Sequence, residues 1–178
     1  MTSVTDFRTR FAAAMNTLSV GAPDARVQVL SIPNIYNLWD VRKGNFLATT
    51  TWALAGICQS MLASPTSTTQ ANVDRRNRVR QRNIDFNTQL EQVCGQYIHC
   101  RYDGGAAFGI SFTAADVSTL DYFHPSVAGQ TKAAATAWNT TFSYSDATAP
   151  TTTRIPASSA TVPAAVPAPD PSAARATA

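Results

Sequence analysis

The sequence lacks an apolar run long enough to cross a bilayer, and no signal peptide is visible in it. Charged residues make up only 14% of the chain against 44% hydrophobic ones, which excludes a disordered chain and leaves enough apolar material for a core. The formal net charge of +3 is too small to indicate a nucleic-acid binder. We therefore expect one folded domain that neither spans a membrane nor binds nucleic acid.

Histidine and cysteine are also scarce, with two and three residues among 178. Cys94 and Cys100 are close enough in sequence to form a disulfide, which would stabilise the fold by about 2 kcal/mol. The alternative is that all three cysteines are buried free thiols, and in either case Cys58 has no partner in this chain. His99 beside Cys100 matches no zinc-binding spacing. The sequence thus predicts no metal site and no cofactor.

Hydrophobic spacing and turn residues predict an α/β fold with the order helix, strand, helix, helix, strand, helix. The expected helices cover residues 4–18, 46–62, 72–97 and 127–142, the expected strands lie at 26–32 and 101–103, residues 36–45 form a loop, and 113–120 form a turn or short helix. The strands are expected to be parallel and covered on both faces. Two strands are fewer than the five or so of a doubly wound sheet.

The domain is expected to span residues 1–144. Residues 145–178 consist mainly of Ala, Pro, Thr and Ser, and such a segment buries too little apolar surface to offset the entropy lost on ordering. We therefore predict a disordered C-terminal tail.

Five arginines lie between positions 75 and 82. One interpretation is a patch that binds phosphate or an anionic surface. The favoured interpretation is the solvated face of the long helix, with ion pairs to Asp74 and Asp85 at helical spacing.

The stretch Asp121-Tyr122-Phe123-His124-Pro125-Ser126 carries the main chemical signal. A histidine that acts as a base on one ring nitrogen needs an acceptor on the other, and an Asp three residues earlier in a tight loop can reach Nδ1. Pro125 favours an extended backbone at His124, and Ser126 is a good cap for the next helix. The alternative is an ordinary surface hydrogen bond, because this two-residue pattern is weak.

Asp121 and His124 would be two members of a nucleophile–base–orienter triad. The sequence offers no convincing nucleophile as the third member. Ser31 ends the first predicted strand but lacks the glycines of a sharp strand-to-helix turn, and Ser60, Ser111 and Ser126 have no better claim.

Four stretches together resemble the secreted actinobacterial SGNH hydrolases, the GDSL-type esterases and lipases. They are residues 29–39 (VLSIPNIYNLW), 80–87 (RQRNIDFN), 100–105 (CRYDGG) and 121–126 (DYFHPS), and the likeness extends over about residues 1–142. It implies a flavodoxin-like three-layer α/β/α fold, a secreted protein, and hydrolysis of a small ester or lipid by a Ser-His-Asp triad. Carried over, His124 is the general base and Asp121 orients it.

The family's nucleophilic Ser, and the Gly and Asn that help to form its oxyanion hole, have no counterpart here. The resemblance therefore implies that this chain is the C-terminal portion of an ester hydrolase and that Met1 is an internal residue of a longer parent. Alone, this portion is expected to be inactive and prone to aggregate. The alternative is a non-catalytic pseudoenzyme or binding module on the same scaffold. Whether the chain is an enzyme, and which oligomeric state it has, the sequence leaves open.

Overall fold

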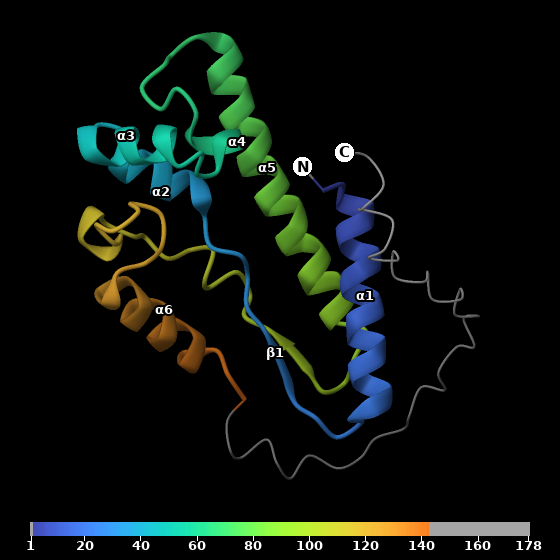
Figure 1. Ribbon diagram of the computed structural model, residues 1–178. Coiled ribbons are helices and arrows are strands. Elements are labelled where there is room, and N and C mark those ends of the chain that lie inside the picture. Colours follow the sequence, from blue (N-terminus) through green and yellow to red (C-terminus); the bar gives the residue numbers. More distant parts are fainter. Residues whose placement is uncertain (1, 143–178) are drawn as a thin grey trace, which may run out of the picture. The chain divides into compact units, whose positions relative to one another are not determined.

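The computed structural model describes residues 2–142, in which helices predominate and two short strands form a parallel sheet (Figure 1). The elements are α1 (Val4–Gly21), β1 (Val27–Val29), α2 (Ile35–Arg42), α3 (Phe46–Leu54), α4 (Gln59–Leu62), α5 (Gln70–Cys94), β2 (Cys100–Tyr102), the 3-10 helix η1 (Ala114–Asp116) and α6 (Val127–Asn139). The predicted mixed α/β class is confirmed at this level. The predicted tail, residues 145–178, lies outside the described residues.

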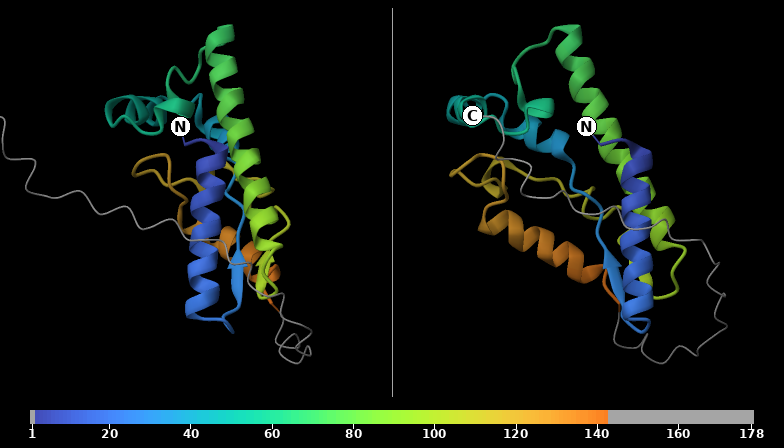
Figure 2. Two further views of the ribbon diagram at one scale, coloured as in Figure 1. Left: turned by 90° about the vertical axis from the view of Figure 1, so that its right-hand side faces the viewer. Right: turned by 45° about the vertical axis from the view of Figure 1, so that its right-hand side comes forward.

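The sheet pairs β1 with β2 in parallel, with Val27, Gln28 and Val29 opposite Cys100, Arg101 and Tyr102. Val29 packs on one face with Leu90 and Cys94 of α5, and α1 lies along α5 in both views of Figure 2. On the other face Gln28 donates a hydrogen bond to the Ala137 carbonyl of α6 at 2.9 Å. Helices therefore contact both faces of the sheet, as expected for parallel strands.

The disulfide between Cys94 and Cys100 is present, so this prediction is confirmed. It joins the last residue of α5 to the first residue of β2. Cys58 is a free thiol, about half-buried beside α4. No helix within residues 2–142 combines the length and the apolar character needed to cross a bilayer.

The loop predicted over residues 36–45 is wrong, because most of it belongs to α2. Asn34 caps this helix by accepting a hydrogen bond from the Tyr36 amide at 3.1 Å. Burial then fixes it: Trp39 is in the core and its indole Nε1–H donates to the Pro65 carbonyl at 2.8 Å. A helix of eight residues is too short to be stable alone, so tertiary packing of Trp39 decides its conformation.

The single helix predicted over 46–62 is also wrong, because it is interrupted between α3 and α4. Gly56 and Cys58 have φ angles of +62° and +41°, in the left-handed region that ends a right-handed helix.

The strand predicted over residues 26–32 is also shorter in the structure than expected. The amide of Ile32 donates to Asn87 Oδ1 of α5 at 2.8 Å, so the chain leaves the sheet there.

The helix predicted over 72–97 corresponds to α5, which begins and ends slightly earlier. The helix predicted over 127–142 corresponds to α6, which ends at Asn139. The turn or short helix predicted within 113–120 contains η1.

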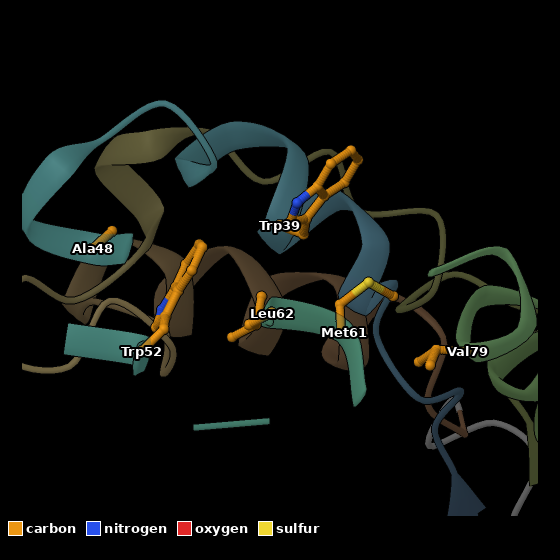
Figure 3. Packing of buried hydrophobic residues seen from close by; sticks show 6 residues of the cluster. All are labelled: Trp39, Ala48, Trp52, Met61, Leu62 and Val79. Carbon is orange, nitrogen blue, oxygen red and sulfur yellow. The ribbon is translucent and has the colours of Figure 1, made fainter. Parts of the chain in front are cut away.

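A second core lies among α2, α3, α4 and the first half of α5 (Figure 3). Its buried members are Trp39, Ala48, Trp52, Met61, Leu62 and Val79, and the partly buried Tyr122 and Phe123 pack against it. We call this group of residues the tryptophan core. Tyr122 and Phe123 immediately precede His124, so the core contacts the loop that carries the Asp-His motif.

The arginines at the start of α5 support the tryptophan core, and the ion pairs predicted with Asp74 and Asp85 are not formed. Arg76 is buried, stacks on the Trp39 ring at 4.5 Å and donates to the Ser67 carbonyl at 2.7 Å. Arg75 donates to the carbonyls of Gln59, Ser60 and Ala63 around α4. Asp74 and Asp85 instead accept hydrogen bonds from Gln70 and Gln81. Carbonyls near a helix end accept hydrogen bonds from nearby side chains, whereas an exposed ion pair contributes little to stability.

Gly129 should not tolerate a side chain. A Cβ atom built there lies 2.1 Å from the Asp116 carbonyl oxygen. We expect Gly129→Ala to lower the free energy of unfolding by about 1–3 kcal/mol, the usual effect of overpacking. Urea unfolding measures it. Gly44→Ala is the matched control, because nothing lies within 4 Å of its Cβ. An equal effect of both substitutions would contradict the close approach of α6 to Asp116.

Candidate functional site

Asp121 and His124 form a hydrogen-bonded pair, which we call the dyad. Asp121 Oδ2 lies 2.5 Å from His124 Nδ1, so the aspartate reaches the ring nitrogen that the spacing in sequence predicts. Asp121 Oδ1 accepts hydrogen bonds from the backbone amides of Phe123 and His124 at 2.9 and 3.0 Å. One carboxylate oxygen thus shapes the loop and the other holds the imidazole.

The other ring nitrogen, Nε2, is directed away from these contacts. The His124 side chain is 73% exposed and that of Asp121 31% exposed. Among the hydrogen bonds of residues 2–142, none involves Nε2. When Nδ1 donates its hydrogen to Asp121, Nε2 carries a lone pair and is available as a base.

The loop that holds the dyad, residues 117–125, is closed by its own backbone. Val117 and Pro125 form an antiparallel bridge, and the Ser118 amide donates to the His124 carbonyl at 2.9 Å. Tyr122 has a φ of +57°, in the left-handed region that non-glycine residues seldom adopt. Such a conformation is retained only where surrounding contacts determine it, and it is often found at functional sites.

Two side chains from the tryptophan-core elements supply those contacts. The indole Nε1–H of Trp52, in α3, donates to the Tyr122 carbonyl at 3.0 Å. Arg42, at the end of α2, donates to the carbonyls of Ala114 and Val117 and lies over the Tyr122 ring at 5.4 Å. The strained residue is therefore fixed through both its backbone and its ring.

On its other side the loop is attached to α6. Asp116 Oδ2 accepts a hydrogen bond from Lys132 Nζ of α6 at 2.5 Å, and further hydrogen bonds from the amide and the hydroxyl of Thr113. The Ser126 amide donates to the Asp116 carbonyl at 2.8 Å, and Ser126 Oγ caps α6 by accepting the Gly129 amide at 3.2 Å. The predicted capping role of Ser126 is confirmed.

Several hydrogen bonds together decide the ionisation of Asp121. Partial burial acts to raise the pKa of Asp121, but the hydrogen bonds from the His124 ring and from the amides of Phe123 and His124 outweigh it. The pKa of Asp121 therefore lies below its usual range, and the carboxylate is ionised at neutral pH. An ionised Asp121 keeps its role as acceptor for Nδ1 throughout the neutral range.

The serines considered from the sequence do not complete a triad in the described residues. Ser31 is 2% exposed, and its hydroxyl donates to Asp103 Oδ2 and accepts the Phe108 amide, each at 2.8 Å. Ser126 Oγ is used in capping and donates to the Ala115 carbonyl. Ser60 Oγ lies 3.9 Å from the Cys58 sulfur, and neither it nor Ser111 bonds His124.

Asp103 forms a second buried polar group at the carboxyl end of β2, which the sequence reasoning did not identify. Burial acts to raise its pKa, but the amides of Ala107 and Gly105 and the Ser31 hydroxyl outweigh it, so the pKa is lowered. Gly104 and Gly105 have φ angles of +65° and +84°, as a tight turn after Asp103 requires. Every oxygen of this carboxylate is bonded, so we assign it a structural role.

No group of three His, Cys, Asp or Glu side chains within residues 2–142 is arranged to hold a metal ion. Two cavities of about 110 and 180 Å³ lie beside α1 and beside Tyr102, and neither is lined by the dyad. Comparison with known protein families, with curated proteins and with solved structures gave no match.

Trp52 is expected to stabilise the dyad loop through its hydrogen bond. Trp52→Phe retains an aromatic ring but leaves the Tyr122 carbonyl without its donor, which should lower the free energy of unfolding by about 1–3 kcal/mol. Trp138→Phe is the control, because Trp138 is 70% exposed. Urea unfolding of both variants measures the difference. Indistinguishable midpoints would show that the bond from Trp52 contributes nothing.

Asp116 should make stability depend on pH in the acid range. Hydrogen bonds from Lys132 and Thr113 lower its pKa from an ordinary 3.8 to about 2. A carboxyl group whose pKa is lower in the folded state contributes stability above its unfolded-state pKa and loses it as the pH falls. The wild type should therefore lose stability relative to Asp116→Asn between about pH 4 and pH 2. Urea midpoints at several pH values measure this, and parallel pH profiles would contradict it.

Proposed function

We propose that the chain contributes the base and its orienting carboxylate to a serine ester hydrolase of the SGNH type. His124 is the general base, Asp121 holds it, and the nucleophilic serine comes from a stretch of polypeptide that this chain does not contain. The observation that carries the proposal is the Nδ1–Oδ2 contact of 2.5 Å combined with an Nε2 that has no partner among residues 2–142.

In the proposed reaction Nε2 accepts the proton of the serine hydroxyl as its oxygen attacks the ester carbonyl carbon. The imidazolium formed is stabilised by the ionised Asp121. It then returns the proton to the leaving alcohol as the carbon–oxygen bond breaks and an acyl-enzyme remains. A water molecule then attacks the acyl-enzyme while Nε2 accepts its proton and returns it to the serine oxygen, and the acid is released. Neither an oxidant nor a metal enters the balance.

The position of the dyad supports this reaction. The chain passes from β1 directly toward α2, and the dyad loop lies beside α2 (Figure 1). In parallel α/β sheets, sites occur beyond the carboxyl ends of the strands. This placement and the resemblance of residues 121–126 to the SGNH hydrolases lead us to propose the flavodoxin-like three-layer fold for the complete domain. The disulfide supports the proposed secretion, because such bonds persist in oxidising compartments.

A non-catalytic role on the same scaffold is the second candidate. It is favoured by the engagement of the candidate serines elsewhere, because the Ser31 hydroxyl donates to Asp103 and the Ser126 hydroxyl to the Ala115 carbonyl. Genomic sequence distinguishes the two: an in-frame serine-containing block upstream of the Met1 codon favours the hydrolase, and a ribosome-binding site preceded by a stop codon favours the second role.

The activity test compares the 178-residue chain with the product of the upstream-extended reading frame. The isolated chain should hydrolyse p-nitrophenyl butyrate no faster than its His124→Ala variant, since it lacks the nucleophile. The extended protein should be active, and His124→Ala or Asp121→Asn should lower its kcat on the order of 10³–10⁴-fold.

The control is His99→Ala, which removes the other histidine and should leave the extended protein's activity unchanged. Two results contradict the proposal. One is an extended protein whose activity is insensitive to His124→Ala. The other is turnover by the isolated chain that His124→Ala abolishes, which would place the nucleophile within this sequence.

A further inference from the structure

A cavity of about 180 Å³ lies between α5 and the chain that follows β2. One face of α5, which includes Asn87 and Glu91, forms one wall, and Tyr102, Gly105 and Phe108 line the other. Glu91 is exposed, so the cavity is open to solvent on that side. A cavity of roughly 150 Å³ holds a molecule of the size of benzene. This cavity therefore has room for a ligand of about six or seven non-hydrogen atoms.

The turn after β2 keeps this space free. Gly104 and Gly105 line the cavity, and both have positive φ angles, which favour glycine. Neither contributes a side chain, and nothing lies within 4 Å of a Cβ atom built at either position. The turn thus borders the cavity with bare backbone that a ligand can approach closely.

The cavity lies in a negative field. Burial opposes the ionisation of Asp103, but hydrogen bonds from two backbone amides and from Ser31 outweigh it and lower its pKa. Burial, and then the negative charges of Asp103 and Glu91, raise the pKa of the Tyr102 hydroxyl. No Lys or Arg side chain among residues 2–142 lines the cavity, and none of them forms an ion pair with Glu91. The field at Tyr102 therefore favours a ligand with a positive charge.

The polar side chains of α5 in the lining fit such a ligand but not a metal ion. The Asn87 amide already exchanges two hydrogen bonds with the backbone of Ile32. Thr88 donates its hydroxyl hydrogen to the Ile84 carbonyl at 3.2 Å, so its oxygen and the Glu91 carboxylate are left as acceptors. These oxygens are too few for a hard metal ion, which takes about six or more oxygen ligands.

Two aromatic rings complete the lining. Tyr102 and Phe108 are partly buried, and no cation–π contact within the described part of the chain involves either ring. Aromatic rings attract quaternary ammonium ions, whose methyl groups need no hydrogen-bond acceptor. A nearby carboxylate adds a Coulomb attraction to this contact.

From the size, the charge and the lining of this cavity we infer that it is a binding site for a small quaternary ammonium ion. Its methyl groups contact Tyr102, Phe108 and the bare turn, and its charge is attracted by Glu91 and Asp103. The dyad does not line the cavity, so the inference is independent of the proposed function.

The test is an NMR titration of the 178-residue chain with choline and with its uncharged isostere, 3,3-dimethylbutan-1-ol. Choline should shift the amide signals of Gly104 and Gly105. It should bind at least tenfold more tightly than the alcohol, because the two molecules have the same shape and only choline is charged. Glu91→Gln should weaken choline binding about fivefold, and Phe108→Leu should weaken it by a similar factor.

The matched controls are Asp85→Asn, a second acidic residue of α5, and Phe112→Leu, a second partly buried phenylalanine, because neither residue lines the cavity. Both variants should bind choline as the wild type does, and so should His124→Ala, which separates this site from the hydrolase proposal. The inference is overturned if choline does not bind, or binds no more tightly than the alcohol. It is also overturned if Glu91→Gln and Asp85→Asn bind choline equally, or if choline shifts signals of the dyad loop and not those of Gly104 and Gly105.

Discussion

The geometry of the dyad depends on the hydrogen bond that Trp52 donates to the Tyr122 carbonyl. Tyr122 occupies a left-handed backbone conformation that an unsupported chain would leave. Burial of the Trp52 ring in the tryptophan core fixes the position of its Nε1. The hydrogen bond from Nε1 then holds the Tyr122 carbonyl of the loop in place. Arg42 repeats the arrangement from α2 by donating to two further carbonyls. Hydrophobic packing in one part of the molecule therefore determines where an exposed imidazole lies.

The loop is held between two supports of different chemistry. The first is the tryptophan core, whose contacts are apolar and whose polar groups bond backbone carbonyls. The second is α6, which binds through the Asp116–Lys132 ion pair and the Ser126 cap. Because both supports act on residues flanking Asp121 and His124, neither has to contact the dyad itself. The site can thus be rigid in its backbone and open to solvent at Nε2.

The sequence predicts the local parts of this arrangement well. The Asp121–His124 spacing, the Ser126 cap and the Cys94–Cys100 disulfide all involve residues near one another in the chain, and short-range geometry decides them. The parts that it misses depend on distant partners. Residues 35–42 become helical because Trp39 is buried against a helix that begins at Gln70. The arginines of that helix bind carbonyls outside it, and the local sequence around the arginines does not indicate these partners. The catalytic role that we propose for the dyad is of this second kind, since it would depend on a hydroxyl outside the described residues.

The proposed chemistry requires that Asp121 holds His124 with Nε2 free to accept a proton. Ring ¹⁵N chemical shifts of the histidines, measured at a pH where both imidazoles are neutral, test it most directly. His99 serves as the internal reference, because no carboxylate within residues 2–142 bonds its ring. We expect His124 to carry its hydrogen on Nδ1 in the wild type and to lose this preference in Asp121→Asn, while His99 is unchanged. A His124 ring protonated on Nε2 in the wild type would contradict it.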